Sequence, residues 1–182
     1  MATRRRITKG LSGALEAVAS ALAELPANGM LIGGIAVIVR GVPRAARDID
    51  FTISGGHSSL ADAAHLLRRR GLVPRIPNAL EFADANQVLL LQHEASGVEV
   101  DLSLAWLAFE EAAIATAESL DIGNVRISVA RPEDLIIYKA IAWRPQDQQD
   151  VERLIALHRA WCPCCPACSN SSSRLGSSCT RI

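Results

Sequence analysis

The stretch "LIGGIAVIVRGVPRAARDIDFTI", residues 31–53, predicts a short buried strand, a helix of about two turns and a second strand. The Gly-Gly pair at 33–34 marks the turn into the helix. Residues 48–53 alternate between acidic or polar and apolar side chains with a period of two, which is typical of a half-buried strand. An ordinary strand of this kind carries hydroxyls or mixed charges on its outer face. This one places Asp48 and Asp50 there, side by side.

Composition limits the classes of protein that are possible. The chain has 182 residues, of which 49% are hydrophobic and only 4% aromatic, so one domain with a core of aliphatic side chains is expected. Lys+Arg and Asp+Glu are both 19, which excludes a globally basic nucleic-acid binder. No apolar run is long enough for a membrane span, and no apolar segment follows the basic N-terminus as in a secretory signal. We therefore expect a cytoplasmic protein.

The remaining patterns predict an α+β (α/β) fold for residues 1–160, with a small mixed β-sheet flanked by helices and a helical C-terminal part. Apolar residues spaced by three and four positions indicate the first helix. Proline at the first helical position indicates the last two helices. The predicted elements are a helix over 11–25, a helix that ends at Arg70, a hairpin of 87–93 and 98–103, a helix over 105–118, a strand over 125–129, and helices begun at Pro132 and Pro145.

The two acids of the strand are candidate metal ligands. Their side chains project the same way, about 7 Å apart at Cα, and repel each other unless a cation joins them. Mg²⁺ prefers such oxygen ligands, with Mn²⁺ as the alternative ion. Asp101, on the strand over 98–103, would complete a site of three carboxylates with Asp48 and Asp50. Such a site holds two metal ions and stabilises in-line attack on phosphorus.

The glycine pair fits the same chemistry. Gly33 and Gly34 lie at a strand-to-helix turn, where backbone N–H groups without neighbouring side chains can approach a phosphate. The sequence therefore predicts that Gly33 and Gly34 face a triphosphate while the acids bind its metal.

The order of these motifs resembles the signature of the DNA polymerase β-like nucleotidyltransferase superfamily. More closely, the chain resembles the minimal bacterial nucleotidyltransferases related to the AbiEii-type toxins. The resemblance covers about residues 10–158 and rests on the stretch quoted above, on "VEVDLSLA" and on "RPEDLIIYKAIAWRPQDQQDVERL".

The resemblance implies an enzyme that moves a nucleoside monophosphate from an NTP to a hydroxyl of a tRNA or other RNA, a protein or a small molecule. It implies that Asp48, Asp50 and Asp101 are catalytic and bind the metals, and that Asp101 also helps to deprotonate the acceptor. It places Lys139 near the nucleotide, together with the glycine pair. A toxin–antitoxin role and an antitoxin protein as partner follow from the resemblance alone.

One departure favours an alternative function. Ala45 and Ala46 stand where the family usually has Ser or Thr before its Asp-x-Asp. The alternative is a non-catalytic module on the same fold that binds a nucleotide or a partner protein.

Other polar residues near the motifs leave alternatives open. Arg47, a candidate nucleotide-binding residue, and Arg44 either bind phosphate or neutralise the acids. Glu99 shares the face of Asp101 but is expected at a solvated edge. A further set serves either a structural pairing across Pro145 or the site itself: Arg144, Asp147 and Asp150.

The last residues, 161–182, form a tail rich in Cys, Ser and Pro, which holds all five cysteines. We expect this tail to be disordered. Zinc binding is the less favoured alternative, because Cys164 and Cys165 are adjacent and do not form two separate knuckles.

Overall fold

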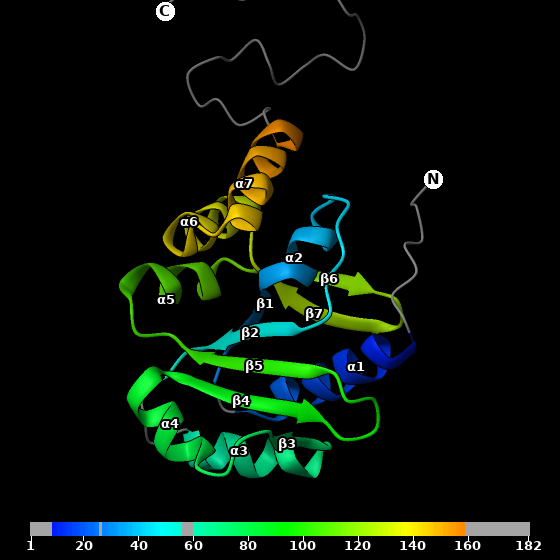
Figure 1. Ribbon diagram of the computed structural model, residues 1–182, viewed down its shortest axis with the longest axis vertical. Helices are drawn as coiled ribbons and strands as arrows, with labels where there is room; N and C mark the ends of the chain where they lie inside the picture. Colours follow the sequence, from blue (N-terminus) through cyan, green and yellow to red (C-terminus); the bar gives the residue numbers. More distant parts are fainter. Residues whose placement is uncertain (1–8, 26, 56–59, 159–182) are drawn as a thin grey trace, which may run out of the picture.

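The computed structural model describes residues 9–25, 27–55 and 60–158. Within these residues seven strands form one mixed sheet in the order β3-β4-β5-β2-β1-β7-β6 (Figure 1). The strands are β1 Gly29–Ile32, β2 Ile49–Ile53, β3 Leu72–Pro74, β4 Val88–His93, β5 Glu99–Leu104, β6 Glu118–Ile122 and β7 Val125–Val129. The helices are α1 Lys9–Glu24, α2 Gly33–Val39, α3 Leu60–Arg69, α4 Ala79–Asn86, α5 Ala108–Ala115, α6 Pro132–Ala142 and α7 Pro145–Leu157.

The centre of the sheet holds the motif strand, β2. Its neighbours are β1, which is antiparallel, and β5, which is parallel. Ile49, Phe51 and Ile53 are fully buried on one face of β2, as their alternation predicts. The opposite face of β2 therefore carries the acidic side chains.

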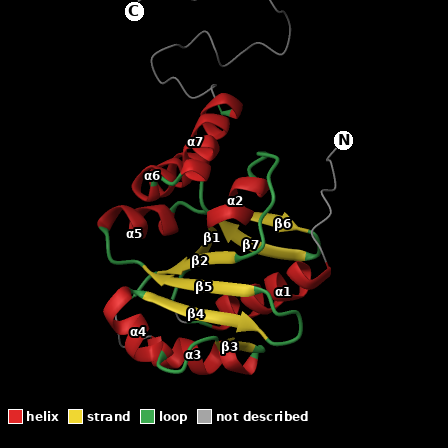
Figure 2. Cartoon of the chain, in the orientation of Figure 1, coloured by secondary structure: helices red, strands yellow, loops and turns green. Residues whose placement is uncertain are grey.

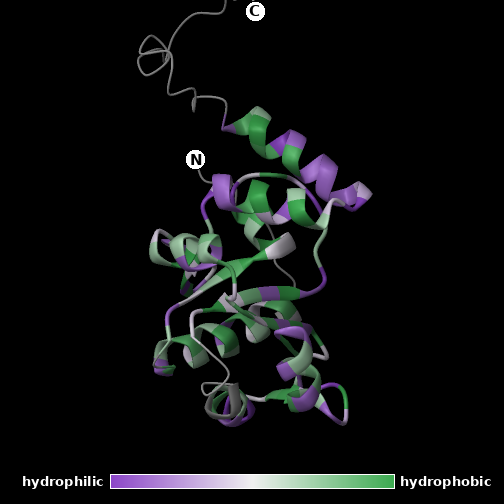
Figure 3. Ribbon diagram, turned by 90° about the vertical axis from the view of Figure 1, so that its left-hand side faces the viewer, coloured by the Kyte–Doolittle hydropathy of each residue, from purple (hydrophilic) through white to green (hydrophobic). Residues whose placement is uncertain are grey.

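The helices pack against different parts of the sheet. Helix α1 contacts α3, β3 and β7, so it crosses one face of the sheet. Helices α6 and α7 pack on each other at the opposite end from α3 and α4 (Figures 1 and 2). Helix α2 contacts β1, β2 and α6, which links the central strands to the C-terminal pair. Figure 3 shows that α7 carries hydrophilic and hydrophobic positions along its length.

The predicted fold class is confirmed, but one element is wrong. The helix expected over 105–118 is shorter, because α5 ends at Ala115 and residues 118–122 are strand β6. This strand pairs with β7 through a tight turn at Gly123, whose φ is 65°. Residues 118–122 contain no alanine and form a strand, because the pairing with β7 satisfies backbone groups along this stretch.

Two further elements were not predicted. Strand β3 and helix α4 lie between residues 72 and 86, where the sequence patterns predicted no element. Strand β3 extends the sheet edge beside β4 and brings Arg75, the residue after it, near the acidic face, while α4 contacts β4.

The cysteine-rich tail, with its expected disorder and its zinc alternative, lies outside the described residues. Among the helices of the described residues, none is both long and apolar enough to cross a membrane.

Candidate active site

Asp50 and Asp101 lie side by side on neighbouring strands. The parallel pairing of β2 with β5 sets Asp50 opposite Asp101 in register. Adjacent strands are about 4.8 Å apart, and side chains of paired residues project from the same face. Asp48 precedes β2 by one residue and follows the same alternation. The fold therefore brings the three predicted carboxylates to one region, although they come from segments far apart in the chain.

The glycine pair makes room for the central acid. Gly33 has a φ of 66°, which favours glycine, and a Cβ built there would lie 1.8 Å from Oδ2 of Asp50. The backbone N–H of Gly34 donates a hydrogen bond to the same carboxylate. In this structure the pair thus supports Asp50 directly, in addition to any contact with a phosphate.

The acidic cluster carries unbalanced negative charge. The pKa of Asp50 is raised from 3.8 to about 6, first by burial and then by repulsion from Asp48 and Asp101. Lys139 and the Gly34 N–H oppose this shift. Burial also raises the pKa of Asp101, against the lowering effect of Arg75. A bound cation would relieve this repulsion.

The chemistry of these side chains fits Mg²⁺, which takes carboxylate oxygens. No group of three or more His, Cys, Asp or Glu side chains within residues 9–25, 27–55 and 60–158 stands ready to hold an ion. Asp101 already has a cationic partner, because its Oδ1 lies 2.8 Å from Nη1 of Arg75. The same nitrogen lies 3.1 Å from Oε2 of Glu99.

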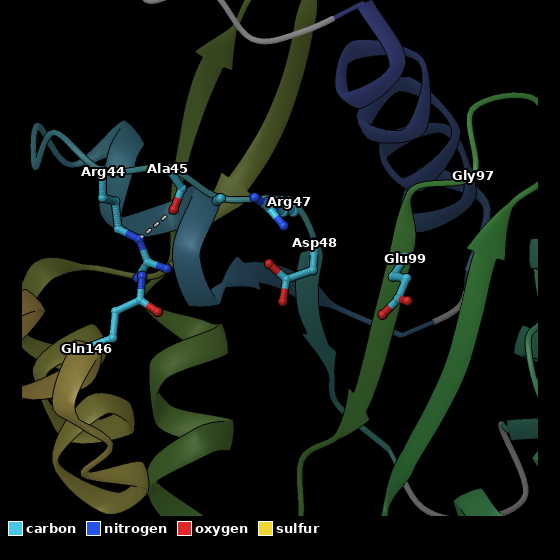
Figure 4. Close-up of a pocket in the computed structure, with 8 residues that line it drawn as sticks. Arg44, Ala45, Arg47, Asp48, Gly97, Glu99 and Gln146 are labelled. Atoms are coloured by element: carbon cyan, nitrogen blue, oxygen red, sulfur yellow. Dashed lines mark hydrogen bonds between the residues drawn. The ribbon is translucent and has the colours of Figure 1, made fainter.

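A pocket of about 570 Å³ opens beside Asp48. Figure 4 shows Arg44 pointing toward Gln146 of α7, while Asp48, just before β2, and Glu99, at the start of β5, lie on the other side. The size suits a small-molecule site. The lining residues are Arg44, Ala45, Ala46, Arg47, Asp48, Gly97, Glu99 and Gln146. Positive and negative side chains thus both line the pocket.

Lys139 is buried against carboxylates of α7. Its Nζ lies 2.7 Å from Oδ1 of Asp147 and 3.4 Å from Oδ2 of Asp150. All three side chains are at least nine-tenths buried. Asp150 also forms an ion pair with Arg44, which lines the pocket. The lysine is thus neutralised first by these two acids, and it acts on Asp50 through the electrostatic field.

The structural pairing across Pro145, one of the two alternatives that the sequence left open for the α7 acids, is present. Asp147 caps α7: its Oδ2 accepts hydrogen bonds from the backbone N–H of Arg144, at 3.2 Å, and from its Nε, at 2.8 Å. That is a structural pairing across Pro145. Asp150 instead ties α7 to Arg44 of the pocket loop, 106 positions earlier in the chain.

Arg75 is the site residue that sequence reasoning missed. It follows β3, which the sequence analysis did not assign, so nothing placed it near Asp101. Glu99 is solvent-exposed as expected, at the hairpin end of β5, with 60% of its side chain accessible, but it also pairs with Arg75.

Comparison with protein families decides the class. A family model described as "Nucleotidyl transferase of unknown function (DUF2204)" matches residues 12–161. This chain belongs to that family. The predicted enzyme class, nucleotidyltransferase, is confirmed by this membership. No protein with a curated description matches the chain.

Solved structures similar to this DUF2204 nucleotidyltransferase share its fold. An antigenic nucleotidyltransferase-like protein from Paracoccidioides brasiliensis has a TM-score of 0.55 and 20% identity, over 82% of this chain and 77% of that chain. The antibiotic-resistance factor ANT(2'')-Ia has a TM-score of 0.57 and 18% identity, over 82% and 85%. The lincosamide antibiotic adenylyltransferase LnuA, solved with lincomycin bound, has a TM-score of 0.55 and 15% identity, over 84% and 99%.

Proposed function

We propose that this protein transfers a nucleoside monophosphate from an NTP to a hydroxyl group in a metal-dependent reaction. The observation that carries the proposal is the register of Asp50 with Asp101, beside the glycine turn that supports Asp50. Asp48, Asp50 and Asp101 would hold Mg²⁺, or Mn²⁺ in its place. The bound ions would supply charge stabilisation for the phosphoryl group and the leaving pyrophosphate.

The chain's own residues would orient the reactants and move one proton. The acceptor oxygen forms a bond to the α-phosphorus, and the bond from that phosphorus to the bridging oxygen of the pyrophosphate breaks. The pyrophosphate leaves with the electron pair, and the carboxylate of Asp101 takes the hydroxyl proton. The raised pKa of Asp101 supports this role, because a more basic carboxylate is the better proton acceptor.

The nucleotide-binding residues of the proposal are Gly33, Gly34, Arg47 and Lys139. Arg47 is exposed and lines the pocket beside Asp48, within reach of an anionic ligand. Lys139 contributes positive charge from its buried position and favours the ionised form of Asp50. The small apolar Ala45 and Ala46 line the same pocket and leave open space beside these charges.

A non-catalytic nucleotide-binding or partner-binding module is the second candidate. The ion pair between Arg75 and Asp101 favours it, because a permanently paired acid binds no metal and accepts no proton. Measured transfer of label decides between the two candidates.

The acceptor is proposed as a class, a hydroxyl of an RNA, a protein or a small molecule. LnuA is an adenylyltransferase for lincosamide antibiotics, which illustrates small-molecule acceptors on this fold. The AbiEii-type relationship, with its toxin role and antitoxin partner, stays a prediction. Co-expression with the products of the adjacent genes, followed by growth assays and co-purification, tests it.

The test of the enzyme is direct. The purified protein is incubated with each α-³²P-labelled NTP, Mg²⁺ and, separately, total RNA, cell protein and a pool of small hydroxyl compounds. We expect label in one acceptor class with the wild type, and loss of at least a hundredfold with Asp50→Asn, as for removal of a group that stabilises transition-state charge. Equal labelling by the two proteins would falsify the proposal.

A further inference from the structure

The contact between Arg75 and Asp101 crosses three strands of the sheet. The backbone N–H of Arg75 donates to the carbonyl of Leu90 at 3.1 Å, which continues the pairing of β3 with β4. Leu90 in turn is in register with Asp101. Two strand spacings, about 10 Å, separate Arg75 from Asp101, a span that an extended arginine side chain can bridge. The backbone of Arg75 is thus fixed, and only its side chain is free to change partners.

The guanidinium is shared between two acids. Nη1 of Arg75 lies 2.8 Å from Asp101 and 3.1 Å from Glu99. The Arg75 and Asp101 atoms are close enough to form an ion pair. Both side chains are more than two-thirds buried, so solvent screens this pair less than the exposed Glu99. The attraction holds Asp101, while Glu99 offers the same nitrogen of Arg75 a second acidic partner.

We propose that Arg75 is a positioning residue that holds Asp101 before the divalent cation binds and competes with that cation for the carboxylate. The inference rests on the proposed function, since it assigns Asp101 to the metal site. In the metal-free protein Arg75 offsets part of the repulsion among Asp48, Asp50 and Asp101. When the cation binds, Asp101 turns to it, and Glu99 retains the guanidinium. Glu99 is therefore the second partner that makes the exchange possible.

The test measures binding of Mn²⁺, without nucleotide, by electron paramagnetic resonance of the free ion. Arg75→Ala removes the competitor, so we expect binding about fivefold tighter than in the wild type, the factor that corresponds to about 1 kcal/mol. Arg75→Gln keeps most of the side-chain stem and serves as the second variant. The matched control is Arg126→Ala, which also removes one positive charge from an ion-paired strand residue and should leave Mn²⁺ binding unchanged.

Glu99 supplies an independent measurement through a double-mutant cycle. Glu99→Gln removes one of the two acids that share the guanidinium of Arg75, so Arg75 should pair more strongly with Asp101. Mn²⁺ binding should therefore weaken in the wild-type background. In the Arg75→Ala background the same change should have a clearly smaller effect, because its route through Arg75 is gone. Equal effects in both backgrounds would contradict the exchange.

The outcomes separate the two proposals. Unchanged or weaker Mn²⁺ binding in both Arg75 variants, with binding still abolished by Asp50→Asn, overturns the role of Arg75 and leaves the metal site intact. A wild type that binds Mn²⁺ no better than Asp50→Asn overturns the proposed function and this inference with it.

Discussion

The carboxylate of Asp50 occupies the space that any side chain at position 33 would need. A Cβ built on Gly33 would lie 1.8 Å from Oδ2 and 2.5 Å from Cγ of Asp50. These two residues come from different segments, but the antiparallel pairing of β1 with β2 places Asp50 opposite Ile32, next to the glycine. The observed position of the Asp50 carboxylate thus depends on the absence of a side chain at position 33.

We predict that Gly33→Ala displaces Asp50 and removes transfer activity. The variant also carries the strain of an alanine at a positive φ, about 1 kcal/mol, to which the collision with the carboxylate adds. We expect a total loss of at least about 2 kcal/mol in unfolding free energy, measured by urea denaturation. Gly123→Ala is the matched control: Gly123 has a φ of 65°, and its Cβ would meet nothing among the described residues within 4 Å. Equal losses in the two variants would contradict the role of the collision.

We predict that Asp50 makes the metal-free protein less stable as the pH rises. Its pKa is about 6 in the fold against 3.8 normally, so the folded state binds more protons than the unfolded chain between about pH 4 and 6. The free energy of unfolding therefore falls as pH rises through this window. We expect the wild type to lose about 1–3 kcal/mol relative to Asp50→Asn between pH 4 and 7, measured in urea with EDTA. Parallel stability curves would show that the acid is not perturbed.

The same variant gives a prediction on metal linkage. At pH 8 without metal, Asp50→Asn should melt at a higher temperature than the wild type, because one of several mutually repelling acids is neutral. Added Mg²⁺ should raise the melting temperature of the wild type and leave that of Asp50→Asn almost unchanged. Thermal melts over a series of Mg²⁺ concentrations measure this, with Asp121→Asn, a change at an exposed acid on the edge strand β6, as the control.

We predict that Lys139→Ala affects both function and stability. A position near the nucleotide predicts at least a tenfold loss of NTP binding and transfer in this variant, about 1.4 kcal/mol. A loss of stability is expected as well, because Lys139 neutralises the buried Asp147 and Asp150. Removal of one partner of a buried ion pair costs about 3 kcal/mol or more, so the variant should unfold at clearly lower urea concentration. An unchanged urea midpoint would show that Arg44 and Arg144 suffice for the two acids.

We predict that the ion pair of Arg44 with Asp150 holds the pocket loop in place for the nucleotide. Arg44→Ala and Asp150→Asn should each weaken NTP binding, because the segment that carries Arg47 and Asp48 loses its ion pair with α7. The double variant should bind about as weakly as the worse single variant, with a coupling energy of about 1–3 kcal/mol. Titration calorimetry with an NTP and Mg²⁺ measures all four proteins. Additive losses would show that the two residues act independently.

The local motifs of the site were predictable because they depend on neighbouring residues. Alternation along residues 48–53 assigned the faces of β2, and the burial of Phe51 agrees with it. The prolines at 132 and 145 correctly marked the starts of α6 and α7. Strand β6 was missed, because its alternation is short, with Leu120 and Ile122 as the apolar positions, and its backbone groups are satisfied by pairing with β7.

The sequence by itself determined the acidic strand, the glycine turn, the helical C-terminal pair and, through their order, the enzyme class. Only the tertiary structure decided which residues meet: Asp50 with Gly33, Asp101 with Arg75, and Lys139 with the acids of α7. The physical reason is that the faces of a strand or helix follow from a repeat of two to four residues. Which residues lie opposite each other across a sheet depends instead on strand order and register, and these are set by the packing of the whole domain.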